Sequence, residues 1–525
     1  MFSRTVSSLF AGIAIVAAIA IAAVGFLRGT YAAGGSDSSC YALMARAFAS
    51  GTLQPSSALE SQVPWPDASR TFAPGGFVPS QSKPAAAAPV CAPGFSLLIA
   101  PMAALGGPDA LFSATPIAGA LLVWLAFLAG RALAGPLAGA MSATLVATSP
   151  IVLFQVVQPM NDITTAALWM AVYVAVLFRR PGLAGACCGL ALLVRPNLLP
   201  LALVSGVFVL TDRIPEPKAL NPEPKALSPK PGVAFCLAAL PSAVAVLYLN
   251  ARLYGGPLRS GYGQLGNLFS LANIPTNAAR YSGWLIQTET PLILLGVLAP
   301  LVVDGHRRRP ASLALCLIAA TAAIYLAYTP FDDWSYLRFL LPAITLLLVL
   351  ASAAATILML RGGGKVGVFV VLFGMAVFGL NGVRLARERF AFDMQALEQR
   401  YRSAGVAARD RLPADAAILT TWDSGAIRFH ARKEAIVWEA LDPAWLDRAL
   451  EWLSQHGHQP FILVESWEEP RFRERFAARS AIGKLDWPPK YEVDRVVRIY
   501  DPADRARYQR GDKFVTEYLW PLRTR

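Results

Sequence analysis

Long runs of apolar residues, each close to the length needed to cross a bilayer as a helix, recur from the N-terminus to about residue 380. Charged residues are absent from these runs and gather in the connections between them. An apolar helix of about 20 residues matches the thickness of a membrane, so each run predicts a transmembrane helix. The clearest runs are residues 9–27, 111–128, 233–249, 313–328, 339–360 and 366–380. The pattern predicts a polytopic α-helical membrane protein.

Basic residues mark every second connection and predict the orientation, because short basic loops stay in the cytoplasm. They are Arg4, Arg131, Arg179, Arg180, Arg213, Lys218, Lys225, Lys230, Arg307, Arg308, Arg309, Arg361 and Lys365. The parity requires about eleven spans, with the short apolar segment 93–105 interfacial or re-entrant. The N-terminus is then cytoplasmic and the C-terminus extracytoplasmic, in what we expect to be a bacterial inner membrane. A crossing at 93–105 would put Asp37 and Asp162 on opposite faces, and we reject it.

The composition changes after residue 382, where charged residues become frequent. Short strand-like runs at 417–420, 435–438 and 461–464 alternate with helical patterns such as 445–454. We therefore divide the chain into a transmembrane domain, residues 1–384 with an outer loop at 28–110, and an extracytoplasmic α/β domain, residues 385–525. The Pro-rich segment 213–231 predicts an extended cytoplasmic tether between two membrane halves.

The overall composition agrees with a membrane protein and excludes a single soluble globular domain. Hydrophobic residues make up 55% of the chain and charged residues only 15%. The net charge of +13 is spread over short loops rather than gathered in one patch, so membrane orientation explains it better than a nucleic-acid partner does. The first apolar run exceeds a typical signal core, and we expect it to be an uncleaved helix.

Two of the six cysteines, Cys40 and Cys91, fall in the same predicted outer loop. The sequence is compatible both with a disulfide between these two cysteines and with two free thiols. The other four lie in apolar segments and are expected to pack there. The histidines of the C-terminal domain, His430, His456 and His458, lack the spacing of metal ligands.

The polar residues that could carry chemistry are expected to meet on the outer face. Asp37 precedes a helical stripe formed by Tyr41, Met44 and Phe48, which predicts a short amphipathic helix with the carboxylate at its N-terminal end. A solvated loop aspartate is the alternative. Asp162 begins a predicted span. Its side chain has two roles open to it, as a helix cap and as an acid that faces the substrate, and one role does not exclude the other. We expect these acids to share one cavity with the loops at 254–290 and 329–338.

In their order along the chain, these motifs resemble the GT-C superfamily of polyprenyl-phosphate-sugar glycosyltransferases, in particular its protein O-mannosyltransferase and aminoarabinose-transferase branch. The resemblance covers about residues 1–385. It rests on Asp37 with Tyr41 and Gly51 after the first span, Ala92-Pro93-Gly94-Phe95, Thr148-Ser149-Pro150 with Asn161-Asp162, and Tyr336-Leu337-Arg338-Phe339-Leu340-Leu341-Pro342.

The resemblance implies transfer of a sugar from a polyprenyl-phosphate carrier to a glycan, lipid or protein acceptor on the outer face, with Asp37 as the base. Such chemistry needs a group that takes the acceptor proton and a cation that stabilises the departing phosphate. Arg338 is the first candidate for the phosphate because its paired donors match phosphate oxygens. An ion pair with Asp332 or Asp333 is the alternative role for Arg338.

Further substrate-binding candidates are Tyr41, Arg195, and the Arg259 and Tyr262 of a Gly- and Tyr-rich segment at 250–263. Glycine and proline there also mark an ordinary turn. Many members of the superfamily carry an acidic pair in the first outer loop, whereas Asp37 is followed by Ser38. A divalent metal therefore stays open, and no metal ligands are assigned.

Two other classes of function compete with transfer. A transporter or flippase of lipid-linked sugars would place ionisable residues at the middle of the spans and show matching repeats, and neither is evident in the sequence. A noncatalytic scaffold with an outer binding domain would not need Asp37.

Overall fold

The computed structural model describes residues 4–211, 230–263 and 265–520, so residues 213–229 of the predicted Pro-rich tether lie outside the described residues. The chain forms two compact units. The first comprises Met1–Gly29, Ser113–Leu247 and Gln264–Asp393, and the second comprises Thr30–Phe112, Tyr248–Gly263 and Met394–Arg525.

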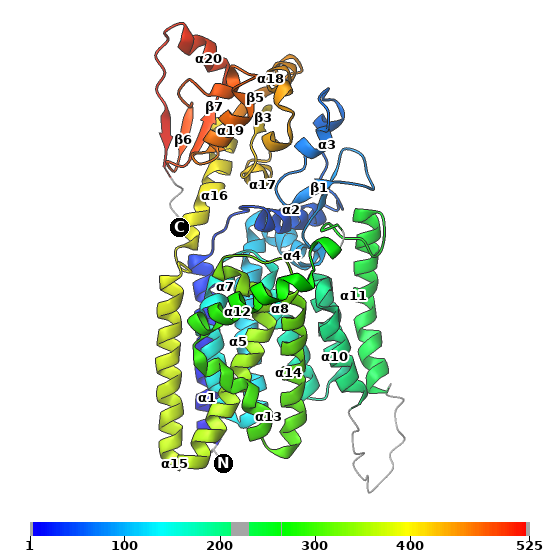
Figure 1. Ribbon diagram of the computed structural model, residues 1–525, viewed down its shortest axis with the longest axis vertical. Coiled ribbons are helices and arrows are strands. Elements are labelled where there is room, and N and C mark those ends of the chain that lie inside the picture. Colours follow the sequence, from blue (N-terminus) through cyan, green and yellow to red (C-terminus); the bar gives the residue numbers. More distant parts are fainter. Residues whose placement is uncertain (1–3, 212–229, 264, 521–525) are drawn as a thin grey trace. The chain divides into compact units, whose positions relative to one another are not determined.

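Helices build the first unit, in which α5 packs against α1, α6 and α8 (Figure 1). Apolar side chains such as Leu9, Val16, Ile19 and Leu27 of α1 face outward and are more than 60% exposed. Outward-facing apolar helices are typical of proteins that lie in lipid. The helices are α1 (Arg4–Arg28), α5 (Ala114–Ala134), α6 (Pro136–Thr148), α7 (Pro150–Val156), α8 (Asn161–Leu177), α9 (Pro181–Val194), α10 (Leu199–Leu210), α11 (Pro231–Tyr254), α12 (Ile274–Glu289), α13 (Ala299–Val302), α14 (Gly305–Leu326) and α15 (Leu341–Glu388).

Five helical stretches of the described residues are long and apolar enough to cross a membrane. Two bent helix pairs, with angles of 59° and 106°, raise the number to seven if each pair is one span. Four shorter apolar helices complete the set. The structure thus confirms several apolar helices, whereas the count of about eleven spans stays a prediction.

The long helix α15 folds back on itself at a glycine. Gly364 has non-helical backbone angles, φ 50° and ψ −117°. A Cβ atom on Gly367 would lie 2.3 Å from the carbonyl oxygen of Met359, although residues at that spacing lie about 12 Å apart in a straight helix. The two apolar runs predicted at 339–360 and 366–380 are therefore separate helices.

A six-stranded sheet with helices on both faces forms the core of the second unit. The strands are β3 (Ala416–Leu419), β4 (Glu434–Ile436), β5 (Gln459–Glu465), β6 (Tyr491–Val493), β7 (Val497–Tyr500) and β8 (Glu517–Leu519), in the order β4-β3-β5-β7-β6-β8. β3 pairs parallel with β4 and β5, and β5 pairs antiparallel with β7. Strands β3, β4 and β5 confirm the three strand-like runs of the sequence.

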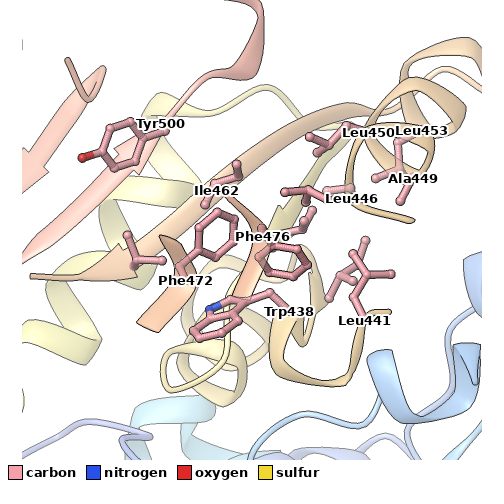
Figure 2. Close-up of a cluster of buried hydrophobic side chains, with 14 of the residues drawn as sticks. Trp438, Leu441, Leu446, Ala449, Leu450, Leu453, Ile462, Phe472, Phe476 and Tyr500 are labelled. Atoms are coloured by element: carbon pink, nitrogen blue, oxygen red, sulfur yellow. The ribbon is translucent and has the colours of Figure 1, made fainter. Parts of the chain in front are cut away.

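Successive residues of the central strands alternate between two hydrophobic clusters, as the pleat of a strand requires. Ile418 packs with α16 (Met394–Arg411) and the short π-helical segment η8 (Ile427–Ala431) on one face. Leu419 and Ile462 pack with α18 (Leu446–Gln455) and α19 (Glu469–Phe476) on the other, where Trp438, Phe472 and Phe476 form the centre (Figure 2). The helix predicted at 445–454 is α18. The sheet is thus buried from both sides.

The segment predicted as the outer loop groups with the C-terminal residues in this second unit. It carries α2 (Asp37–Ala49), α3 (Ala68–Thr71), α4 (Pro93–Gly106) and the hairpin of β1 (Phe77–Pro79) and β2 (Ala87–Pro89). Leu59, Trp65 and Phe72 belong to the same hydrophobic cluster as Trp438, and the Val437 amide donates to the Thr71 carbonyl. The compact unit therefore joins residues on both sides of the sequence-based domain boundary at 384–385, because these apolar side chains complete one core.

Glu289 is a buried residue that joins the two bent helix pairs of the first unit. Its carboxylate accepts from the Ser149 hydroxyl at 2.6 Å and from the Ile151 backbone amide. Ser149 lies at the break between α6 and α7, and Glu289 ends α12 at the second break. A helix break leaves backbone amides without helical partners. The buried Glu289 carboxylate accepts from one such amide, that of Ile151.

We expect Glu289→Ala to lower the stability of the detergent-purified protein by about 1–3 kcal/mol, since it leaves buried donors unsatisfied. Thermal unfolding of the variant measures the effect. Glu289→Gln keeps an acceptor oxygen and serves as the matched control, with a smaller expected loss. An equal loss in both variants would contradict this role.

Candidate functional site

Asp37 is the first residue of α2 in the second unit and is half-buried. The predicted short helix is present, and its residues from Ser39 to Ala45 are buried. The N-terminal end of a helix carries a partial positive charge that favours an ionised carboxylate. The fold therefore places Asp37 at the N-terminal end of a largely buried helix.

The backbone just before Asp37 is fastened to the C-terminal part of the same unit. The Ala33 amide donates to His430 Nε2 at 3.1 Å. A Cβ atom on Gly34 would lie 2.3 Å from the Tyr401 ring and 2.5 Å from a Glu398 carboxylate oxygen, so only glycine fits this approach. Burial and nearby arginines lower the pKa of His430 to about 3, which keeps its acceptor nitrogen unprotonated at neutral pH.

A second set of bonds holds the helix itself. The Ser39 hydroxyl donates to the Gly75 carbonyl at 3.0 Å, and the Gly75 amide donates to the Ser424 hydroxyl at 2.9 Å. The Arg46 guanidinium donates to the carbonyl oxygens of Phe429 (2.7 Å) and Arg428 (2.8 Å). Ser39 and the Ala33–His430 bond thus fix the N-terminal end of α2, and Arg46 fixes its last turn to η8. These roles of Arg46, Ser424 and His430 depend on partners about 350–400 residues away, for which the sequence holds no local signal.

The other face of α2 packs on α4. Cys40 and Cys91 form a disulfide, the pair for which the sequence left both states open. The Tyr41 ring is buried and packs edge-to-face with Phe95 at 5.1 Å between ring centroids. This gives Tyr41 a packing role, and substrate binding by Tyr41 stays a prediction.

Asp162 and Arg195 form a buried ion pair in the first unit. Arg195 Nη2 donates to Asp162 Oδ1 at 2.7 Å and to Asn161 Oδ1 at 3.1 Å, and Asp162 is only 1% exposed. Asn161 Nδ2 donates to the Val194 carbonyl next to Arg195. The start of α8 and the end of α9 are thus joined by a charged pair that the apolar surroundings would penalise if it were broken.

Arg338 lies beside this pair and shares an aromatic neighbour with it. The centre of its guanidinium lies 5.2 Å from the ring centroids of both Tyr336 and Phe339, and Nη1 contacts Met160 Sδ at 3.2 Å. The Arg195 guanidinium lies 5.7 Å from the Phe339 ring. Three of the predicted site residues, Asp162, Arg195 and Arg338, are therefore brought together around Phe339.

Arg259 and Tyr262 lie at the surface of the second unit. Their loop is held against β2, where the Tyr254 hydroxyl donates to the Pro89 carbonyl at 2.9 Å. A Cβ atom on Gly261 would lie 2.2 Å from that same carbonyl oxygen, so the loop approaches more closely than any side chain allows. Both residues are accessible for binding, a role that stays a prediction.

Among the described residues, no cluster of side chains is suited to bind a metal ion. They contain no group of three or more His, Cys, Asp or Glu side chains that could hold a metal ion. The question of a divalent metal therefore rests on the chemistry of the substrate, and we assign no metal ligand.

Comparison of the sequence with protein-family models and with curated proteins finds no significant match. Solved structures do match. ArnT from Cupriavidus metallidurans in the apo state is similar with a TM-score of 0.54 at 12% identity, covering 94% of this chain and 97% of ArnT. ArnT bound to undecaprenyl phosphate gives 0.52 at 14% identity, covering 90% and 96% of the two chains.

The archaeal oligosaccharyltransferase AglB from Archaeoglobus fulgidus, in complex with an inhibitory peptide and a dolichol-phosphate, gives a TM-score of 0.50 at 14% identity. The match covers 92% of this chain and 72% of AglB. These neighbours are glycosyltransferases of the GT-C type. At this level of identity the likeness establishes the fold, and it confirms the GT-C resemblance of the sequence motifs at that level.

We expect His430→Ala to increase amide hydrogen exchange in the peptide that contains Ala33 by about tenfold or more, since the amide loses its acceptor. Because the pKa of His430 is lowered to about 3, protection in the wild type should persist from pH 7 down to pH 5. Exchange mass spectrometry measures both. His458→Ala is the control, and a similar change in that variant would refute the specific anchor.

Proposed function

We propose that this chain is a glycosyltransferase that moves a sugar from a polyprenyl-phosphate carrier to an acceptor on the extracytoplasmic face of a bacterial inner membrane. The observation that carries the proposal is the GT-C fold, because the similar ArnT and AglB structures were solved with undecaprenyl phosphate and with a dolichol-phosphate. Fold alone does not fix activity. The proposal therefore also depends on the residues assigned below.

Asp37 is the base in this proposal. It would take the proton of the acceptor group as that group attacks the anomeric carbon of the sugar, while the bond from that carbon to the phosphate oxygen breaks. Supporting this role are its place at the start of α2 and the bonds of Arg46, Ser39 and His430 that hold the helix. A base that is already held in position loses less entropy when it is oriented for the reaction.

Arg338 is the phosphate ligand in this proposal. Arg195 already donates to Asp162 and Asn161, so its charge is offset by a buried carboxylate. Arg338 rests on the rings of Tyr336 and Phe339 and on the Met160 thioether, and its planar guanidinium offers paired donors that match phosphate oxygens. We assign Asp162 to holding Arg195 in place rather than to proton transfer, since its buried carboxylate accepts from Arg195 Nη2 at 2.7 Å.

We expect Asp37→Asn to lower sugar transfer by about 10²–10⁴-fold, the usual contribution of general base catalysis, while expression and membrane insertion stay unchanged. The glycolipid and glycoprotein profile of cells that lack the chain, restored with each variant, measures transfer. Asp67→Asn, an exposed aspartate of the same unit, is the matched control. Normal transfer by Asp37→Asn would disprove the base and favour transport of a lipid-linked sugar or a scaffold.

Arginine variants separate a binding role from a structural one. We expect Arg338→Ala to accumulate normally in the membrane and to raise the donor concentration needed for half-maximal transfer by about tenfold or more. Arg195→Ala should instead lower the amount of folded protein, because a buried carboxylate left alone costs about 3–5 kcal/mol. Titration of labelled lipid-linked donor in membranes, with immunoblots for protein amount, measures the two effects.

The double change Asp162→Asn with Arg195→Met removes both charges and should recover folded protein relative to Arg195→Ala. If the amount of Arg338→Ala protein in the membrane falls as much as its transfer activity, phosphate binding is contradicted and an ion-pair role is favoured.

A further inference from the structure

The carboxyl ends of β3 and β5 are a topological switch point of the sheet in the second unit. From β3 the chain continues to η8 on one face of the sheet and then to β4, whereas from β5 it continues to α19 on the opposite face. Loops that diverge in this way after neighbouring parallel strands are the usual place for ligands in α/β sheets. In this unit the two loops contain Trp422 and Trp467, respectively.

These two tryptophans contact each other and are open to solvent. Their ring centroids lie 5.4 Å apart in an edge-to-face arrangement, and the residues are 42% and 44% exposed. Leaving so much aromatic surface in water costs free energy that burial elsewhere in the core would recover. Paired, exposed indoles at a switch point are therefore more consistent with binding than with packing.

Polar groups surround the pair and fix its geometry. Glu465 accepts from Trp467 Nε1 at 2.6 Å and from Arg400 Nε at 3.0 Å. The Arg471 guanidinium lies 6.0 Å from the Trp467 ring centroid and forms a 3.3 Å ion pair with Glu439. Carboxylates and a guanidinium at the edge of an aromatic surface supply both acceptors and donors for hydroxyl groups.

Asp423, the residue after Trp422, adds a buried polar group without a partner. It is fully buried, and within the described residues neither of its carboxyl oxygens has a hydrogen bond. Burial raises its pKa, and the carboxylates of Glu465 and Glu468 raise it further. A buried acid without partners is costly, so Asp423 marks a polar group near the switch point that a bridging water can satisfy.

We propose that Trp422 and Trp467 form a binding site for the ring of a sugar, with Glu439 and Arg471 as the groups that receive its hydroxyls. The C–H face of a pyranose matches a flat indole, and its hydroxyl rim matches the surrounding charged groups. Arg400 and Arg471 beside the pair are already matched by Glu465 and Glu439, which disfavours phosphates and anionic lipid headgroups as ligands. The ligand is therefore an uncharged carbohydrate.

This site also contacts the helix of Asp37 within the same unit. Ser424, next to Asp423, accepts from the Gly75 amide, and a Cβ atom on Gly425 would lie 2.3 Å from Ser39 Cβ. A sugar at the switch point would thus touch the loop that fixes the start of α2. That this sugar belongs to the acceptor rests on the proposed function, whereas its binding does not.

The test uses the full chain in detergent and methyl glycosides of glucose, mannose and galactose as probes, observed by saturation-transfer difference NMR. We expect at least one glycoside to receive saturation and expect Trp422→Ala and Trp467→Ala to weaken its binding by about tenfold or more, as for an aromatic anchor. Trp520→Ala is the matched control, since this tryptophan is 72% exposed and also lies near an arginine. Asp37→Asn should bind the glycoside normally even though transfer is lost.

Trp422→Phe and Trp467→Phe keep a ring and should retain measurable binding, which separates loss of a contact from loss of folding. The proposal is overturned if none of the glycosides receives saturation, or if Trp520→Ala weakens binding as much as the other variants. It is equally overturned if Trp422 and Trp467 are needed for binding to phosphatidylglycerol vesicles instead. None of these outcomes bears on Asp37, so failure of this site and failure of the transfer reaction are distinguishable.

Discussion

The need to satisfy buried polar groups around the start of α2 fixes how this helix is held in the second unit. Ser39, Gly75 and Ser424 form a short chain of hydrogen bonds, and His430 accepts from Ala33 a few residues before Asp37. Each bond is modest alone, but a buried donor left without an acceptor costs more than the bond contributes. The α/β sheet therefore serves as a rigid support that gives one carboxylate a defined place.

In the first unit, the same requirement applies to charge. Arg195 and Asp162 offset each other in an apolar setting, and Glu289 does the equivalent for two helix breaks by accepting from Ser149. Apolar surroundings make such groups costly unless they are matched. Arg338 lies against the aromatic rings of Tyr336 and Phe339, and its planar guanidinium has the donor geometry for the anion-binding role that we propose.

The α/β domain is more than a support in this interpretation. Its buried core is complete without Trp422 and Trp467, which remain at the surface on diverging loops. Proteins place binding groups on loops that a stable sheet positions, because the sheet can then keep its packing while the loops change. Since the Ser424 loop also contacts α2, binding at the sheet and positioning of Asp37 share a single structural element.

The sequence alone determined the apolar helices, the strands β3, β4 and β5, helix α18, the short helix α2 and the GT-C motif order. These features depend on the spacing of hydrophobic residues and on local composition, and a short stretch of sequence is enough to determine both. It could not supply the pairing of Asp162 with Arg195, 33 residues away, or of Ala33 with His430, 397 residues away. Such contacts form only when distant segments pack, and a residue's type does not tell which distant partner the fold will bring to it. Tertiary structure alone therefore decided that residues 59–72 of the outer-loop segment and the C-terminal sheet form one core in the unit that also contains the helix of Asp37.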